Sequence, residues 1–458
     1  MHRLELTEIA SVIGSPIPDG AEGFTTSGYS IDSRTLRTGD LFFALKGAAN
    51  DGHGFVRDAW EKGAVGAVVE RRLEDLPRSF PQMVVPSSLV ALQRIASFVR
   101  SRTDIPVVAV TGSNGKTTTK EMIAFLLSTR MKVRKSPGNF NNHIGLPLSL
   151  LGLEHSDEAL VVEIGSNHPG EVDALCRMAQ PQVGVITNVG RAHIGLFGSL
   201  EGVAREKSDL ARCLQSGGEA VVNSDDEPLM AQIRSIDVET ITFGLKAGAD
   251  FRATAVDVSQ SSGSSFTLGG LAVSLKAPGI HNVYNALAAI ATAGVFGISV
   301  RDAGEAIRIY EPMRMKTETY GGITLIDDTY NSNPDSVAAA LSVLAAGRGG
   351  RRVFVMGDML ELGASSEALH REVGSLVARS PVDLLVTIGD MARWASDEAR
   401  SRGMDERAVV HFASKAEAKR ELRSLVKPED VVLIKGSRLA GLDEIAEFLR
   451  SSATVWRV

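Results

Sequence analysis

A glycine-rich segment with a Lys-Thr pair, GSNGKTT at residues 112–118, is the part of the sequence best suited to chemistry. The apolar residues 107–110 precede it and predict a buried strand, and apolar residues at helical spacing follow it. Its glycines let backbone N–H groups converge on an anion, and Lys116 can neutralise phosphate oxygens at the helix N-terminus. Thr117 offers a hydroxyl to a nucleotide-bound Mg²⁺. The segment therefore predicts a nucleoside triphosphate site, since an ordinary glycine turn would not need the Lys-Thr pair.

Two further side chains lie where a parallel sheet places ligand-binding groups. Glu163 ends the apolar run 159–163, and His193 follows the apolar run 183–186. Both are therefore expected at the carboxyl edge of one sheet, where ligands bind in such folds. A carboxylate at this edge is a natural Mg²⁺ ligand. A single histidine is more often structural, so His193 alone is ambiguous.

Lys207 is a third candidate, 14 residues after His193. One continuous helix would separate these two residues by ~21 Å. Glycines within residues 195–202 interrupt that path, so the chain can fold back and bring Lys207 towards His193. The alternative is an ordinary surface lysine paired with Glu206 or Asp209.

Three short polar clusters allow two interpretations each. Residues 139–143 contain three asparagines and a histidine, which suits either polar recognition or a loop. Asp-Ser-Arg at 32–34 and Asp-Gly-His at 51–53 suit either ligand binding or simple turn chemistry. The sequence alone leaves these alternatives open.

The composition is that of a globular protein with several domains. The chain has 458 residues, enough for about three domains of ~150 residues. Its net charge of −6 provides no general basic field for nucleic acid. The two cysteines lie far apart and form no zinc or disulfide motif. The apolar stretch 286–300 is too short to span a bilayer and favours a buried helix, and the N-terminus does not resemble a signal peptide, so we expect a cytoplasmic protein.

Alternating strand and helix patterns predict an α/β protein of three domains. Residues 1–84 are expected to form a small N-terminal α/β domain, for which the family resemblance given below implies a role as the substrate domain. Residues 85–312 are expected to form a central P-loop ATPase domain with a parallel sheet and an antiparallel insertion at 249–276. Residues 313–458 are expected to form a Rossmann-like, doubly wound parallel-sheet domain. A P-loop joined to two further domains, with no GTPase-type Asn-Lys-x-Asp element, indicates an enzyme that uses ATP on a bound substrate.

A series of motifs along essentially the whole chain resembles the Mur ligase family. TGSNGKTTT, GNFNNHIGLPLSLL, EIGSNHPGEV, TNVGRAHIG, HNVYNALAA, DDTYNSNPDS, GDMLELG and KGSR occur in that order. GNFNNHIGLP, DDTYNSNP and GDMLELG are most similar to the family branch that adds a D-alanyl-D-alanine dipeptide. The Asp-Asn-Pro-Arg motif of the diaminopimelate-adding branch is missing, and KGSRLAGLDEI departs from the usual Met-Glu ending.

This resemblance implies an ATP-dependent amide ligase of peptidoglycan precursor synthesis. It would join D-Ala-D-Ala to UDP-N-acetylmuramoyl-tripeptide through an acyl phosphate, with release of ADP and phosphate. The implied cofactors are ATP and two Mg²⁺ ions, with Lys207 carbamylated. We expect a monomer without nucleic-acid or membrane partners. The alternatives are a sibling ligase, such as a folylpolyglutamate synthase or another Mur enzyme, and a nucleotide switch that hydrolyses ATP without ligation.

The resemblance also implies roles for individual residues, with Lys116, His193, Lys207 and Arg314 as the catalytic set. The implied nucleotide contacts are Gly112, Ser113, Asn114, Gly115, Lys116, Thr117, Thr118, Asn282, Asn285, Arg314 and Asp328. The implied metal ligands are Thr117, Glu163, His193 and Lys207. The implied substrate contacts are Ser33 and Arg34 at the uridine end, Asn141 and Asn142 in the middle, and Asp358, Lys435, Ser437 and Arg438 on the amine side.

Overall fold

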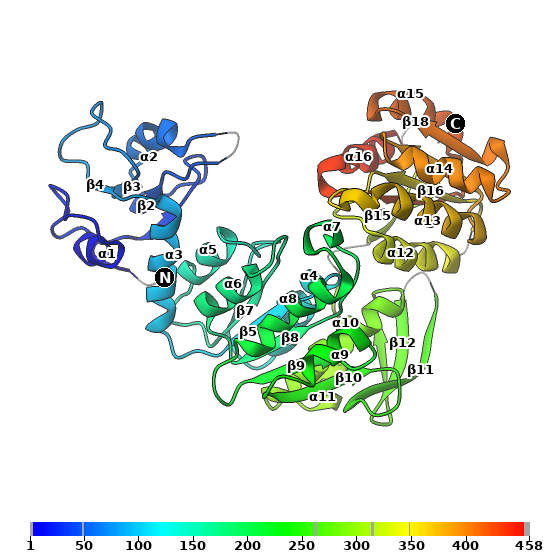
Figure 1. Cartoon of the computed structure of the whole chain (residues 1–458), viewed down its shortest axis with the longest axis horizontal. Coiled ribbons are helices and arrows are strands. Elements are labelled where there is room, and N and C mark those ends of the chain that lie inside the picture. The colour runs from blue at the N-terminus through cyan, green and yellow to red at the C-terminus, as the bar shows by residue number, and fades with distance from the viewer. Residues whose placement is uncertain (1–2, 48–49, 261–262, 313–315, 348, 453–458) are drawn as a thin grey trace.

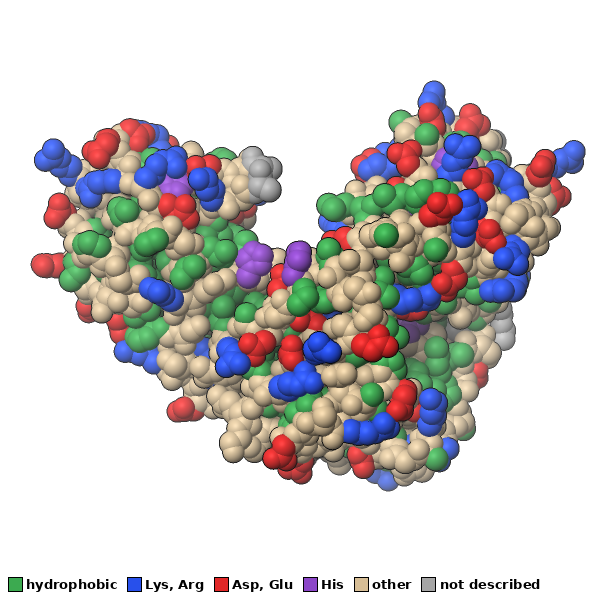
Figure 2. All heavy atoms as spheres, in the orientation of Figure 1, with side chains coloured by type: hydrophobic (Ala, Val, Ile, Leu, Met, Phe, Trp, Pro, Cys, Tyr) green, Lys and Arg blue, Asp and Glu red, His purple; other side chains and the backbone are tan. Residues whose placement is uncertain are grey.

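The computed structural model describes residues 3–47, 50–260, 263–312, 316–347 and 349–452, and its strands form three sheets (Figure 1). The N-terminal and C-terminal parts form two arms that rise from the central part (Figure 1). Figure 2 shows a wide hollow between these arms. Among the described residues, no helix combines the length and hydrophobicity needed to cross a membrane.

The N-terminal part contains a four-stranded sheet in the order β1-β2-β3-β4, with every neighbouring pair parallel. Helix α3 packs against both this part and the central part, because its buried face, including Leu92 and Ile95, belongs to a core that both parts share. No clean break in packing therefore separates the first two predicted domains. The elements are α1 (Leu6–Ile13), β1 (Gly28–Ser30), β2 (Asp40–Phe43), the 3₁₀ helix η1 (Gly52–Phe55), α2 (Val56–Glu61), β3 (Gly66–Val69), β4 (Gln82–Val84) and α3 (Ser88–Ser101).

The Asp-Gly-His cluster has a structural role in this part. Asp51 accepts a hydrogen bond from the backbone N–H of His53, which caps η1. The buried His53 ring places its Nδ1 2.6 Å from Asp51 and accepts the Glu70 N–H at its Nε2, at 2.9 Å. These contacts join the loop to the end of β3, so the cluster has a structural role.

The central sheet has nine strands in the order β13-β12-β11-β10-β9-β8-β5-β7-β6. The seven strands from β11 to β6 pair in parallel, whereas β11, β12 and β13 pair antiparallel. The predicted antiparallel segment at 249–276 is confirmed, and it extends the main sheet because β11 pairs with β10. The strands are β5 (Val107–Thr111), β6 (Val133–Lys135), β7 (Ala159–Glu163), β8 (Val183–Ile186), β9 (Glu219–Asn223), β10 (Glu239–Gly244), β11 (Phe251–Gln260), β12 (Gly263–Leu268) and β13 (Leu271–Leu275).

Helices cover both faces of the central sheet, and α10 is buried along most of its length, as its apolar sequence predicts. The observed helix spans Ile280–Val295. It therefore begins before the apolar stretch 286–300, for which a buried helix is predicted, and ends before that stretch does. The helices are α4 (Lys116–Leu127), α5 (Gly145–Leu151), α6 (Glu171–Ala179), α7 (Ile194–Phe197), α8 (Leu200–Arg212), α9 (Glu227–Ile233), α10 (Ile280–Val295) and α11 (Val300–Ile307).

The C-terminal sheet has six strands in the order β14-β15-β19-β16-β17-β18, with a hydrophobic core on each face. The five strands from β15 to β18 in this order pair in parallel. The predicted doubly wound parallel sheet is confirmed, and β14, whose sequence KTETY lacks an apolar run, adds an antiparallel edge strand to it. The strands are β14 (Lys316–Tyr320), β15 (Ile323–Asp328), β16 (Arg352–Gly357), β17 (Leu384–Ile388), β18 (Val409–Phe412) and β19 (Val431–Lys435).

The helices of this part complete the doubly wound arrangement. They are α12 (Pro334–Ala346), α13 (Ser366–Arg379), α14 (Ala392–Ser401), α15 (Lys415–Leu425) and α16 (Asp443–Ser452), with 3₁₀ helices η2 (Gly363–Ser365), η3 (Glu406–Ala408) and η4 (Arg438–Ala440).

Candidate active site

A cavity of about 720 Å³ lies where the central and C-terminal parts meet. Its wall includes the P-loop, the amide-rich loop after β6, the end of β7, the start of α10 and three C-terminal loops. The structure thus brings together most of the residues for which the sequence predicts a role. Those that line the cavity are Ser113, Asn114, Gly115, Lys116, Thr117, Thr118, Asn141, Asn142, Glu163, His193, Asn282, Asn285, Asp328, Lys435, Ser437 and Arg438.

The P-loop connects the fully buried strand β5 to helix α4, and its glycines are sterically required. Gly115 caps α4 at φ +83°, and a Cβ there would lie 2.4 Å from Asn285 Oδ1. Gly112 has φ +140°, and its Cβ would lie 2.0 Å from Thr187 Oγ1. The half-buried Lys116 donates from Nζ to the carbonyl of Gly112 at 2.7 Å and to that of Ser113 at 3.2 Å. These contacts hold the ammonium group along the loop, where it can meet a phosphate.

Thr117 and Glu163 form a close polar pair in the cavity. Thr117 Oγ1 donates to Glu163 Oε2 at 2.7 Å, and Asn141 Nδ2 donates to Glu163 Oε1 at 2.8 Å. The carboxylate is buried at the end of β7, as the strand pattern predicts. A hydroxyl and a carboxylate beside a phosphate site fit Mg²⁺, which takes a few protein oxygens together with phosphate oxygens and water. Among the described residues, no group of three or more His, Cys, Asp or Glu could hold a metal by itself.

Lys207 is buried, so the surface-lysine alternative is wrong. The glycine-interrupted segment folds into the short helix α7 and then α8, on which Lys207 is 2% exposed and donates to Ser166 Oγ at 2.7 Å. Glu206 instead accepts the N–H groups of Gly170 and Val172 at the start of α6. Burial, together with the positive charge of Lys116, lowers the pKa of Lys207 to about 7. Lys207 lies behind Ser166, which lines the cavity.

His193 faces the C-terminal part. Its backbone is in the left-handed region at φ +58°, and its Nδ1 lies 2.6 Å from Glu361 Oε2. That separation is an ion-pair distance with poor hydrogen-bond geometry. The interaction with His193 lowers the pKa of Glu361. A strained backbone with an imidazole at a domain junction is typical of a functional position.

The predicted asparagines of α10 form a buried ladder beside the P-loop helix. Thr119 Oγ1 donates to Asn285 Oδ1 at 3.2 Å, and Asn285 Nδ2 donates to Asn282 Oδ1 at 3.2 Å. Asn282 Nδ2 donates to the Pro278 carbonyl at 2.8 Å. The ladder fixes the start of α10 against α4, so the N-terminal ends of both helices border the cavity.

His281, which sequence reasoning missed, also lines the cavity. Its Nε2 lies 3.1 Å from Asn282 Nδ2, so the amide donates to it and the ring proton belongs on Nδ1. That Nδ1 is buried and has no hydrogen-bond partner among the described residues. Burial lowers the pKa of His281 to about 4, with the nearby charge of Asp328 opposing this effect and that of Lys435 adding to it. The motif HNVYNALAA held the signal, because its histidine precedes the predicted asparagines.

We expect His281 to make the protein sensitive to acid. The unfolded chain protonates this imidazole near 6.5, whereas the folded protein does so only near 4. The unfolded state therefore binds more protons across this window, and stability falls as pH drops from 6.5 to 4. His281→Gln should reduce the loss of unfolding free energy between pH 7 and pH 5 by about 1–2 kcal/mol, because glutamine takes up no proton in this range. Urea unfolding at both pH values measures this difference, and His155→Gln, a change at an exposed histidine, is the control. Equal losses of unfolding free energy in wild type, His281→Gln and His155→Gln would contradict the prediction.

The C-terminal side of the cavity carries a buried ion pair. Lys435, which is 1% exposed, donates from Nζ to Asp328 Oδ2 at 2.5 Å and to the Asn331 carbonyl at 2.9 Å. Ser437 Oγ accepts the Leu360 N–H at 2.9 Å and so holds the loop after β16. Adjacent parallel strands β15 and β19 bring Asp328 and Lys435 into register.

Three predicted site residues lie elsewhere. The Asp358 carboxylate accepts the Ala392 N–H at 2.7 Å, which caps α14, and burial raises its pKa. Ser33 and Arg34 lie in the N-terminal arm, where the Arg34 guanidinium binds Asp32 at 2.7 Å and is largely exposed. None of these three lines the cavity. Arg314 lies outside the described residues.

Models of known families match most of the chain. Residues 25–100 match the model described as Mur ligase family, catalytic domain. Residues 110–293 match the Mur ligase middle domain, and residues 313–438 match the Mur ligase, glutamate ligase domain. The three matched segments follow the three sheets of the structure.

Individual relatives match along nearly their full length. The UDP-N-acetylmuramoyl-tripeptide–D-alanyl-D-alanine ligase of Bacillus subtilis is 37% identical over 432 residues, which cover 93% of each chain. A crystal structure of MurF from Acinetobacter baumannii has a TM-score of 0.88 and 32% identity, and covers 98% of this chain and 99% of its own. MurF from Thermotoga maritima in complex with ADP has a TM-score of 0.81 and 27% identity, and covers 94% and 98%.

The fold and the cavity define a three-domain P-loop enzyme whose cavity is completed by its C-terminal part. With family models matching most of its length, the chain belongs to the Mur ligase family. Within that family, the relatives that match along nearly their full length include the Bacillus subtilis ligase and the MurF structures described above.

Proposed function

We propose that this chain joins D-alanyl-D-alanine to UDP-N-acetylmuramoyl-tripeptide in an ATP-dependent ligase reaction of peptidoglycan precursor synthesis. The observation that carries the proposal is that the P-loop, the Thr117–Glu163 pair and the C-terminal Lys435 line one shared cavity. The full-length relatives named for this reaction support the choice of substrates. Their names also favour this branch over a sibling ligase.

The proposed reaction begins with activation of the tripeptide carboxylate, which is a poor electrophile. Transfer of the γ-phosphoryl group of ATP gives an acyl phosphate, and the neutral amine of D-Ala-D-Ala then displaces phosphate to form the amide. Lys116 would hold the β- and γ-phosphates and offset the repulsion between the two anionic reactants. Exclusion of water protects the acyl phosphate, and closure of the hollow between the arms would provide it.

The proposal includes two Mg²⁺ ions. Thr117 and Glu163 would hold one of them, and His193 and Lys207 would support the second. When bound, these ions would neutralise phosphate charge and orient the oxygens that react. An ammonium group does not fit beside a cation, so Lys207 fits this role only as a carbamate, which has carboxylate-like oxygens. The buried amine would add CO₂ and lose one proton to form that anion.

The remaining assignments stay predictions that the cavity supports in part. Asn282, Asn285, Asp328 and Arg314 would contact the nucleotide, although Arg314 is not among the described residues. Asn141 and Asn142 would contact the middle of the UDP substrate, and Ser33 and Arg34 its uridine end. Lys435, Ser437 and Arg438 would border the amine substrate, together with Asp358 if its cap is released. The domain limits 1–84, 85–312 and 313–458 and a monomeric state also stay predictions.

Omission of single substrates tests the proposed function. The assay measures phosphate release from ATP with the UDP-linked tripeptide and D-Ala-D-Ala, each left out in turn. We expect phosphate release and ligated product only when both are present. Turnover of ATP that is independent of both would indicate a nucleotide switch, and turnover with another carboxylate–amine pair would indicate a sibling ligase.

A further inference from the structure

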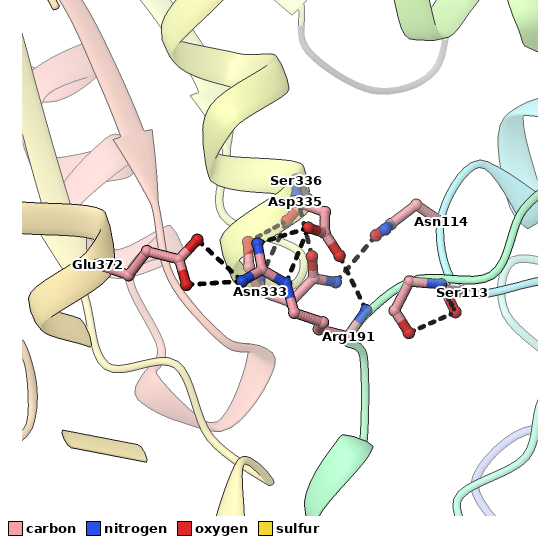
Figure 3. A network of polar contacts seen from close by, with 8 residues as sticks. Ser113, Asn114, Arg191, Asn333, Asp335, Ser336 and Glu372 are labelled. Carbon is pink, nitrogen blue, oxygen red and sulfur yellow. Dashed lines mark hydrogen bonds and ion pairs between the residues drawn. The ribbon is translucent and has the colours of Figure 1, made fainter. Parts of the chain in front are cut away.

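Arg191 connects the central and C-terminal parts through a dense set of ionic hydrogen bonds (Figure 3). Its Nη1 lies 2.6 and 2.8 Å from the two carboxylate oxygens of Glu372 on α13. Its Nη2 and Nε donate to Asp335 Oδ1 at 2.7 and 3.1 Å, and its backbone N–H donates to Asp335 Oδ2 at 2.8 Å. One residue of the loop after β8 thus holds two C-terminal helices at once.

The contact between the central and C-terminal parts also includes the P-loop. Asn333 caps α12, next to Asp335, and its Nδ2 donates to Asn114 Oδ1 at 2.9 Å. Gly190, which precedes Arg191, donates its N–H to Ser113 Oγ at 2.8 Å. Figure 3 shows Arg191 and Asn114 meeting the start of α12 from neighbouring loops. The N-terminal end of α12 is therefore docked directly beside the phosphate-binding loop.

Arg191 acts on the site from outside it. Asn114, Gly190, Asn333 and Asp335 line the cavity, whereas Arg191 does not. Its side chain is about 30% exposed, and its guanidinium spans two carboxylates, a geometry in which charged hydrogen bonds retain more strength than at an open surface. Glu372 contacts this guanidinium from α13, away from the cavity wall. The arrangement suits a residue that positions a domain and takes no part in chemistry.

We propose that Arg191, Asp335 and Glu372 form an interdomain latch, which holds the C-terminal part against the P-loop before the nucleotide binds. The latch makes Arg191 a positioning residue for the proposed ligase, so this inference rests on the proposed function for its catalytic meaning. ATP then meets a site in which both walls of the cavity are already in place.

The latch has a defined thermodynamic consequence. When only a fraction of the molecules is docked, the apparent dissociation constant of a nucleotide rises by the inverse of that fraction. Loosening the latch should therefore weaken nucleotide binding and raise KM for ATP. It should leave kcat nearly unchanged, because the fully loaded enzyme is docked in either case. A general loss of fold stability would not produce this split.

Glu372→Gln tests the latch with little risk to folding, because Glu372 is half-exposed. Glu367→Gln is the matched control: Glu367 is similarly exposed on the same helix, and its ion pair with Arg371 stays within α13. Calorimetric titration with a non-hydrolysable ATP analogue and Mg²⁺ should show binding ~3- to 10-fold weaker in Glu372→Gln. The control should stay within ~2-fold of wild type. Scattering from the nucleotide-free Glu372→Gln protein should show a larger radius of gyration.

A double mutant connects the effect to Arg191. Adding Glu372→Gln to Arg191→Met should weaken binding no further than Arg191→Met alone, since the contact is already lost. Unchanged or tighter nucleotide binding by Glu372→Gln, or additive effects in the double mutant, would overturn the latch. These measurements need neither the tripeptide nor D-Ala-D-Ala, so failure of the latch and failure of the proposed ligase reaction are separate results.

Discussion

Replacement of Lys116 by alanine should lower turnover by ~100-fold or more, with the fold intact. Removal of one preorganised group aimed at developing charge typically costs about 3–4 kcal/mol of transition-state stabilisation, and each 1.4 kcal/mol is tenfold in rate. The Nζ of Lys116 already lies against the carbonyls of Gly112 and Ser113, so the charge is in place before the phosphates arrive. The side chain is only half-buried, so its loss should leave the core intact.

Steady-state phosphate release with both substrates measures this effect, and circular dichroism and thermal unfolding verify the fold. Lys132→Ala is a suitable control, because Lys132 is an exposed lysine of the same part of the chain that pairs with Glu154. The control should keep near-normal turnover. A folded Lys116→Ala protein with near-normal turnover would remove the basis for the phosphate assignment.

Most of the fold could be predicted because strands in buried parallel sheets are short apolar runs. The sequences LLVTI of β17 and VVLIK of β19 are such runs. Edge strands lack such an apolar run, since one side of the strand and often both faces stay polar. The sequence KTETY of β14 is such a strand, and its pairing became evident only with the structure.

The local parts of the site could be predicted, whereas its long-range parts could not. Glycine and Lys-Thr spacing places the P-loop, and a strand end places Glu163, because both depend on neighbours in sequence. The contacts of Arg191 join residues 144 and 181 positions apart, and no local pattern encodes such partners. The orientation of the Asp358 carboxylate could not be predicted either, because a hydrogen bond from the N-terminus of α14, a segment distant in sequence, sets it.

Lys207→Arg should be nearly inactive, with a loss of turnover of roughly 100- to 1000-fold, the range seen when one electrostatic contributor is removed. In the structure Lys207 is buried against Ser166, and burial lowers its pKa to about 7, so a useful fraction of the amine is neutral near physiological pH. A neutral amine can add CO₂ to become an anionic oxygen ligand, as the proposed second Mg²⁺ requires. Arginine keeps its positive charge and cannot form a carbamate, although it preserves length and hydrogen-bonding capacity.

The carbamate interpretation also predicts that activity depends on CO₂, which the arginine variant alone does not test. Wild-type activity should fall when CO₂ and bicarbonate are removed from the enzyme and should recover when bicarbonate returns. Arg205→Lys, an exposed change on the same helix, should follow wild type in both respects. If Lys207→Arg retained substantial turnover, Lys207 would have no role as a metal ligand. If that variant were inactive but removal of CO₂ left the activity of wild type unchanged, the buried ammonium group of Lys207, next to Ser166, would be the functional group.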